Sequence, residues 1–304
     1  MATTANTNNV AVLNVGDEDF RRLNHMQRAL RRLSKDYITI AALSVIGLLV
    51  LMAVTAPVTT QIIGIDPFTE NLQKTYAAPD GENWLGTDNK GRDHLARLMY
   101  GAQISLSVAF TAAFLALSIG LTLGIITGYY GGVVDDFMIW FITTLGSIPG
   151  LFLLLMVSSL FRPGPLAFIL ILGLLGWIGT MRLVRGETLA LKEREYIIAA
   201  RAMGASDARI MFSHIMPNLL SIVIVSLAIQ IGGLILTESA LSYLGFGINP
   251  PIATWGNMLS GSQDFWRRSR LLVVGPGLLI AVTVLCLYVI GDGLRDAFDP
   301  TATD

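Results

Sequence analysis

The sequence predicts an all-α membrane protein with six transmembrane helices, and three observations lead to this prediction. The chain has 304 residues, of which 53% are hydrophobic and 14% charged, whereas a soluble domain usually carries about 25% charged residues. The mean hydropathy is +0.61. The apolar residues gather into uncharged runs of 17 to 24 residues, and a helix needs roughly 17–25 residues to cross the hydrocarbon core of a bilayer.

Six such runs follow one another, and none shows the polar stripe at helical spacing that is typical of a helix on a soluble core. They are Tyr37–Val58, Ile104–Thr127, Phe137–Leu160, Pro165–Met181, Leu219–Thr237 and Leu271–Ile290. These runs divide the chain into four parts. We expect an N-terminal tail with a basic segment over 1–36, a first helix and outer loop over 37–102, a five-helix domain over 103–295 and a C-terminal tail over 296–304.

The distribution of Lys and Arg predicts the orientation of the helices. Of the 21 basic residues, six lie in the N-terminal tail and six in the loop 182–218, and loops rich in Lys and Arg usually face the cytoplasm. Alternation through six spans leaves 13 basic residues inside and eight outside, with both termini cytoplasmic. Arg267, Arg268 and Arg270 do not fit this pattern, because they abut the last span on the predicted outer side.

The composition argues against several classes of function. A net charge of −1 gives no electrostatic basis for a nucleic-acid partner. Three scattered histidines supply neither a metal site nor a catalytic cluster. The segment 86–93 comes closest to a P-loop but fails at its final two positions. An ion-coupled secondary transporter stays an alternative, although such carriers usually place ionisable residues within their spans. A membrane-embedded enzyme is a second alternative.

The loop 182–218 contains the pattern of a helical hairpin. Residues 195–203 favour a helix, and Gly204 fits the left-handed position that ends one. Ser206 can cap a second, short helix, and Pro217 marks the start of the fifth span. On composition alone, an ordinary surface hairpin is favoured over a docking element.

The spacing within this hairpin resembles the coupling motif of ABC importer permeases, in which an Ala pair, a Gly and a Pro recur at fixed distances. Aligned on Gly204, the pair is Ala199 and Ala200, and the proline is Pro217. The departures from the general motif are Ile198, His214 and Met216. The oligopeptide and dipeptide branch commonly reads Ala-Ala-Arg-Ala-x-Gly-Ala and His-x-x-Pro-Asn, which matches 199–205 and 214–218.

Four other segments resemble the C-type permease of that branch. They are Trp-Leu-Gly-Thr-Asp at 84–88, Gly-Tyr-Tyr-Gly-Gly at 128–132, Leu-Ser-Tyr-Leu-Gly-Phe-Gly at 241–247 and Gly-Asp-Gly-Leu-Arg-Asp-Ala at 291–297. Together with the hairpin they cover most of the chain in the order of the family. Each segment alone is weak, and the five in order are specific.

The resemblance implies a type I ABC importer transmembrane fold in a bacterial inner membrane, for di- or oligopeptides or similar small solutes. It implies three kinds of partner: a homologous permease, two ATPase subunits that bind ATP and Mg²⁺, and an extracytoplasmic substrate-binding protein. The chain itself would hold no cofactor and catalyse nothing. The residues implied in coupling to the ATPase are Tyr196, Ala199, Ala200, Arg201, Gly204, Ala205, Asp207, His214 and Pro217.

Two further groups of residues are predicted from position and type. Gly120, Gly124 and Gly128 repeat every four residues in the second span, and small residues at this spacing allow two membrane helices to approach closely. The polar residues of the fifth span are expected on the side of the translocation path. They are Gln230, Thr237 and Glu238.

Overall fold

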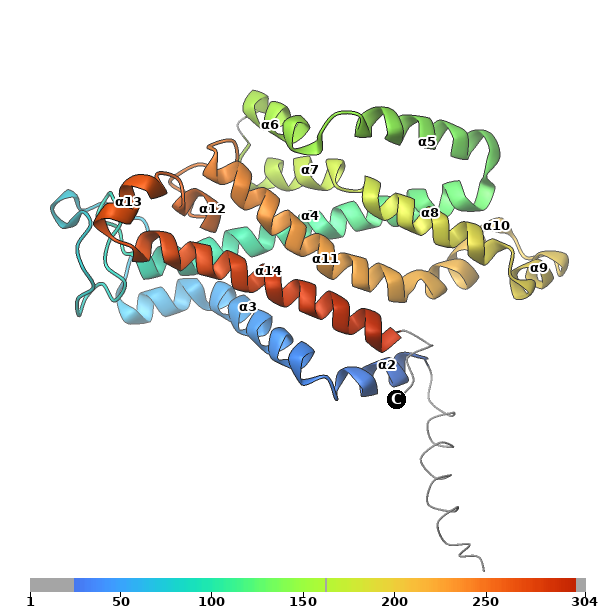
Figure 1. The fold of residues 1–304 in the computed structure, drawn as a ribbon, viewed down its shortest axis with the longest axis horizontal. Helices are drawn as coiled ribbons and strands as arrows, with labels where there is room; N and C mark the ends of the chain where they lie inside the picture. The colour runs from blue at the N-terminus through green and yellow to red at the C-terminus, as the bar shows by residue number, and fades with distance from the viewer. Residues whose placement is uncertain (1–24, 162, 299–304) are drawn as a thin grey trace, which may run out of the picture.

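Figure 1 shows the computed structural model, which describes residues 25–161 and 163–298. Within these ranges all named elements are helices. Five helices are long and apolar enough to cross a membrane, and there are six if a bent pair counts as one span. The predicted all-α membrane class is confirmed. The outermost parts of the two predicted tails, 1–24 and 299–304, lie outside the described residues.

The first span is α3, Tyr37–Ile63, which follows the short basic helix α2, His25–Leu33. Asp36 caps α3, because its side chain accepts hydrogen bonds from the backbone of Ile38 and Thr39. A hydrogen bond from the Thr39 hydroxyl, together with these backbone bonds, holds the pKa of the Asp36 carboxyl below its usual value. The helix therefore begins where the apolar run begins and extends a little beyond its predicted end.

The second span, α4, runs from His94 to Tyr130 and is the central helix of the fold. It begins well before the apolar run, because Asp93 caps it by accepting a hydrogen bond of 2.7 Å from the Ala96 amide. It packs most extensively against α3 and three later helices, and four of its six buried alanines lie in the main hydrophobic core. The loop 64–93 between α3 and α4 contains one short helix, η1, Leu72–Lys74.

The third span is broken, which the uncharged run did not predict. It consists of α5, Gly132–Gly146, and α6, Gly150–Phe161, bent by 76°. Pro149 lies in the break, and a proline has no amide hydrogen and disfavours helix at the preceding residue. The expectation of one continuous third helix is therefore wrong, although the Pro-Gly pair at 149–150 carried the signal.

The fourth span is also interrupted, into α7, Pro165–Leu175, and α8, Ile178–Lys192. Its second half packs against α4 along the glycine stripe. A Cβ atom at Gly120, Gly124 or Gly128 would stand 2.7 Å from the Cβ atom of Thr180, Val184 or Thr188 respectively. The two four-residue repeats thus face each other, and a side chain larger than hydrogen has no room between the helices.

The remaining helices follow α8 along the chain. They are α9, Glu195–Ala202, α10, Asp207–Arg209, η2, Ile210–Ile215, α11, Met216–Tyr243, α12, Trp255–Met258, α13, Ser262–Arg268, and α14, Leu271–Phe298. In Figure 1, α2, α9 and α10 lie toward one end of the bundle, which we call the hairpin end. The loop 64–93, α12 and α13 lie at the opposite end, which we call the loop end. Segments predicted on the same side of the membrane therefore share an end.

Candidate functional site

The helical hairpin 195–217 is the candidate functional site, and its bend is set by Gly204. This residue has φ +85°, a conformation that side-chain-bearing residues rarely adopt. Its amide donates to the Arg201 carbonyl at 3.0 Å, and the Ala205 amide donates to the Ala200 carbonyl at 3.1 Å. This pair of bonds is the Schellman motif, which ends a helix and turns the chain sharply.

After the bend, Ser206 caps the next helix, with its hydroxyl accepting from the Arg209 amide at 3.4 Å. The second arm differs from the expected short helix, because helix continues through α10, η2 and α11 as far as Tyr243. The six-residue π segment ends at Ile215, two residues before Pro217. Wide turns of this kind often accompany a proline, whose ring would crowd the carbonyl four residues earlier. The hairpin is therefore continuous with the fifth span.

One face of the hairpin is packed. Ile197 of the first arm is fully buried and belongs to one cluster with Ile210 and Ile215 of the second arm. Ala200 is also buried. The same cluster includes Val184 of α8. The hairpin thus has a small hydrophobic core of its own that joins it to the ends of the membrane helices.

Several apolar side chains of the hairpin are exposed. Met203 is 83% exposed at the bend, Phe212 is 59% exposed, and Tyr196 and Ile198 are each about half exposed. Monomeric proteins rarely leave such groups together in water unless they form a contact with another molecule. Among the other predicted coupling residues, Ala199, Arg201, Asp207 and Pro217 are exposed, and Ala205 and His214 are half-buried.

A polar contact that the sequence did not predict ties the hairpin to α4. The Tyr129 hydroxyl donates a hydrogen bond of 2.7 Å to Asp207 Oδ1. The Arg201 guanidinium lies 5.4 Å from the centroid of the Tyr129 ring, within the range of a cation–π contact. Both arms of the hairpin thus contact one side chain near the end of α4. Nearby, Arg185 of α8 forms an ion pair with Asp135 of α5.

The polar residues expected along the path have different surroundings from one another. Gln230 Nε2 donates to the Gly176 carbonyl at 3.0 Å, between α7 and α8. A break leaves such carbonyls without a helical partner, and inside a membrane they need one from the protein. Thr237 lines a cavity of about 290 Å³ that also contacts Gly146 and Gly150 at the break of the third span.

Glu238 is turned into the protein and does not line the cavity at Thr237, and its predicted place on the translocation path stays a prediction. Its side chain is fully buried, and it accepts hydrogen bonds of 3.1 Å from Ser105 and 2.8 Å from Ser242. A carboxyl group in a membrane helix turns inward when polar partners are available inside the protein. The polarity of Glu238 was visible in the sequence, but the serines that hold it inward come from α4 and from the end of α11.

The segment that most resembled a P-loop is folded around its own carboxylate. Asp88 Oδ1 accepts from the amides of Lys90 and Arg92 at 2.8 and 3.0 Å. These amides are the groups that a phosphate-binding turn would offer to its ligand. Among the described residues, no group of three or more His, Cys, Asp or Glu side chains could hold a metal ion.

Comparison with known proteins connects this architecture to a family. Residues 120–304 match the family model described as "Binding-protein-dependent transport system inner membrane component". The oligopeptide transport system permease protein OppC of Bacillus subtilis (strain 168) is 34% identical over 95% of each chain. OppC of Escherichia coli (strain K12) is 38% identical over 90% of each chain. The dipeptide transport system permease protein DppC of Bacillus subtilis is 35% identical over 91% of this chain and 86% of its own.

The family match covers the glycine stripe, the hairpin and the last two spans, and the relatives extend the similarity over nearly the whole chain. The all-helical fold with five or six spans agrees with it. The chain therefore belongs to the family of binding-protein-dependent transport system inner membrane components, with the membrane domain of a type I ABC importer.

Proposed function

We propose that this chain is a permease subunit of an ATP-driven importer of di- or oligopeptides, and that its hairpin docks onto an ATPase subunit. The relatives named for oligopeptide and dipeptide transport support the cargo class. The observation that carries the docking proposal is the apolar tip of the hairpin, where Met203 at the bend is 83% exposed. ATP and Mg²⁺ would be bound by the ATPase partners, and this chain would supply no catalytic group.

The hairpin is built to transmit a displacement as a rigid body. Its own core fixes the two arms against each other, its second arm runs without interruption into α11, and Tyr129 links both arms to α4. Closure of an ATPase pair that grips the tip would therefore tilt α4 and α11 together. Such rigid-body movements of packed helices are the usual means of switching access between the two sides of a membrane.

A homologous permease would complete the translocation path, and a substrate-binding protein would deliver the peptide at the loop end. The cavity at Thr237 supports a position for the path, because it lies between two interrupted spans. Interrupted helices are tolerated at membrane depth where they are buried in protein or line a water-filled cavity. The shared end of α2 and the hairpin supports a cytoplasmic position for both, in a bacterial inner membrane.

The test uses Met203→Glu, which places a charge in the proposed contact and alters no packed position. We expect the variant to insert normally, to lose most co-purifying ATPase and to lose ATP-driven peptide uptake in proteoliposomes. Trp84→Glu is the matched control, because Trp84 is 57% exposed at the opposite end. It should retain the ATPase. If Met203→Glu retains the ATPase and full uptake, the docking proposal fails.

The alternative function, an ion-coupled secondary transporter, has one observation in its favour. Glu238 is a buried carboxyl group inside a membrane helix, and such groups often carry protons in secondary carriers. Its serine partners supply the hydrogen bonds that a purely structural group would need. Peptide uptake by this chain alone, in liposomes with an ion gradient and no ATP, would establish the alternative and overturn the importer proposal.

A further inference from the structure

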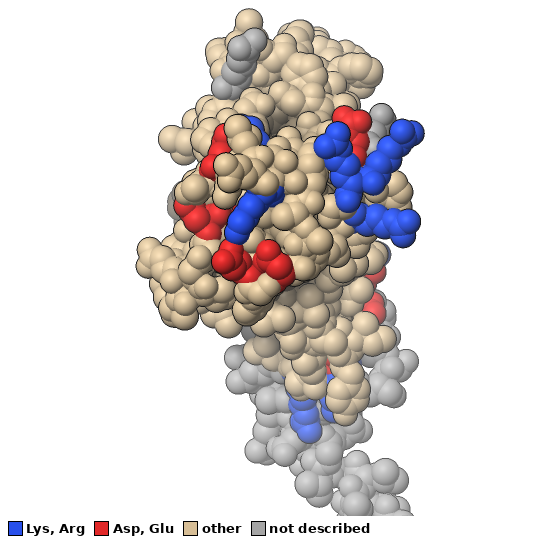
Figure 2. Space-filling view, turned by 90° about the vertical axis from the view of Figure 1, so that its left-hand side faces the viewer, with Lys and Arg blue, Asp and Glu red and all other residues tan. Residues whose placement is uncertain are grey.

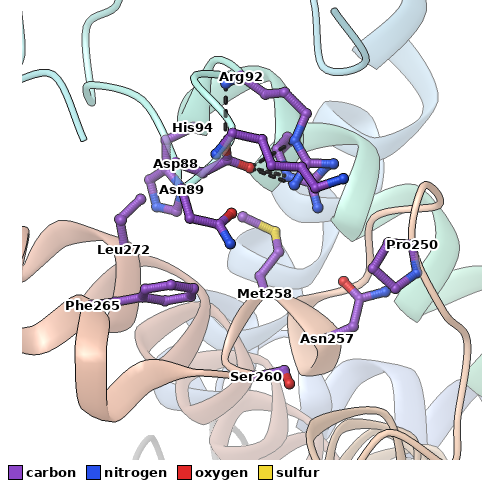
Figure 3. Close-up of a pocket in the computed structure, with 12 residues that line it drawn as sticks. Asp88, Asn89, Arg92, His94, Pro250, Asn257, Met258, Ser260, Phe265 and Leu272 are labelled. Carbon is purple, nitrogen blue, oxygen red and sulfur yellow. Dashed lines mark hydrogen bonds and ion pairs between the residues drawn. The ribbon is translucent and has the colours of Figure 1, made fainter. Parts of the chain in front are cut away.

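The loop end contains a cavity of about 200 Å³ that the proposed transport mechanism does not use. Figure 2 looks onto this end of the molecule, where acidic and basic side chains are gathered over the surface. Figure 3 shows the cavity itself, with Asp88, Arg92 and His94 on one side and Met258 and Phe265 on the other. It therefore has one polar wall and one apolar wall.

The polar wall carries more positive than negative charge. Asp88 Oδ2 lies 2.7 Å from Arg92 Nη2 and 3.3 Å from Arg97 Nε, so one carboxylate serves two guanidinium groups. Lys90 also lines the cavity, and its ammonium pairs with Glu70 at 2.6 Å. His94 Nε2 lies 3.2 Å from the Leu271 carbonyl and is occupied by it. The cluster thus has one uncompensated positive charge.

Arg97 is the group with unused bonding capacity. It is 4% exposed and lines the cavity, and within the described residues its Nη1 atom has no hydrogen-bond partner. Asp88 has little capacity left to accept a hydrogen bond from this Nη1 atom, because its two carboxylate oxygens already accept from two amides and two guanidinium groups. A buried charged donor without an acceptor is costly. An acceptor of negative charge would satisfy Arg97 and neutralise the cluster.

The size of the cavity and its apolar wall limit the kinds of acceptor that fit. Pockets for complete small molecules usually have about 300–1,000 Å³, so this cavity fits the end of a ligand better than a whole one. Met258, Phe265 and Leu272 offer contacts to aliphatic carbon. A carboxylate also suits the planar guanidinium, which can bind both of its oxygens.

We propose that this cavity binds a carboxylate group carried on a short aliphatic stem, with Arg97 as its principal donor. Two sources at the outer face supply such a group: the C-terminal residue of a peptide, and an Asp or Glu side chain of a docked protein. The proposal that the cavity binds a carboxylate rests only on the residues of the cavity. Only the assignment of the source rests on the proposed peptide-importer function.

The test measures binding of propionate to the assembled transporter in nanodiscs by saturation-transfer NMR, with propionamide as the neutral control. Asn89 lines the cavity and is exposed, so it can be changed without disturbing the buried cluster. Asn89→Asp adds a like charge and should weaken propionate binding about fivefold. Asn89→Ala, the matched control, should leave it within about twofold, because it removes the amide without adding charge.

The same experiment identifies the source by competition. Displacement of propionate by alanylalanine, but not by its C-terminal amide, assigns the site to cargo. Displacement by peptide-free substrate-binding protein assigns it to an acidic side chain of that protein. The proposal would be overturned if propionate bound equally to the native chain and to Asn89→Asp, or if propionamide bound as well as propionate. It would also be overturned if neither competitor displaced propionate. Failure of peptide uptake by the native transporter would overturn the proposed function and leave the propionate result standing.

Discussion

The two ends of the molecule differ in how their charged side chains are placed, although both expose some apolar side chains, such as Trp84 at the loop end and Met203 at the hairpin end. At the loop end, charged and polar side chains are buried and bonded to one another, as in the contact of Asp88 with Arg92 and Arg97. At the hairpin end, apolar side chains such as Met203 are left outside. A network of buried polar bonds fixes a shape that does not depend on a partner. An exposed apolar tip indicates a surface that becomes buried in the assembly.

The largest effect on stability is expected from disrupting the buried ion pairs at the loop end. Asp88→Asn removes the charge that two buried guanidiniums share, and breaking a buried ion pair typically costs about 3–5 kcal/mol. We expect the variant to be poorly recovered from membranes, with a lower unfolding midpoint in mild detergent. Lys90→Met, which removes a half-exposed ion pair with Glu70, should leave the midpoint nearly unchanged. Equal behaviour of the two variants would show that the network is not what stabilises this end.

The second effect concerns the helix that connects the ends. Gly124→Leu places a side chain where a Cβ would already meet Val184 at 2.7 Å, and overpacking costs about 1–3 kcal/mol or more. We expect α4 and α8 to separate, with a lower unfolding midpoint and reduced uptake. Gly186→Ala is the control on α8, because nothing lies within 4 Å of a Cβ there. That variant should be neutral or slightly stabilised, and a loss of stability in it would contradict the assigned packing face.

A smaller effect is expected at the hairpin end, from a substitution of Tyr129. Tyr129→Phe removes the hydrogen bond to Asp207 and keeps the ring beneath Arg201. One such bond is worth about 0.5–1.5 kcal/mol, so the hairpin should remain folded and retain the ATPase. We expect ATP-driven uptake to fall several-fold while ATPase co-purification stays at the native level. Parallel loss of both would mean that Tyr129 supports folding of the hairpin and does not transmit movement.

The sequence predicted the parts of this molecule that depend on local pattern. Uncharged runs located the membrane helices, and Gly204 followed by Ser206 located the bend, because a left-handed stop and a helix cap are both properties of single residues. The break at Pro149 was readable too, but a run judged by the absence of charge does not register a proline.

The rest depended on residues that are far apart in the chain. Tyr129 and Asp207 are 78 positions apart, and Ser105 reaches Glu238 over 133. No local pattern indicates which of several polar residues in a span turns inward, because this is decided by the helix that packs against it. The same limit hid the unused donor of Arg97, which becomes visible only when the partners of Asp88 are known.

The most direct test of the account is a photo-crosslinking measurement on the assembled transporter. A benzophenone amino acid is placed at Met203, or at Trp84 as the control. Both side chains are exposed, and the segments that carry them, the hairpin and the loop 64–93, lie at opposite ends. The account predicts an ATP-sensitive crosslink from position 203 to an ATPase subunit and none from position 84. Absence of that crosslink from position 203, with the complex intact, would contradict the claim that the hairpin is the ATPase contact.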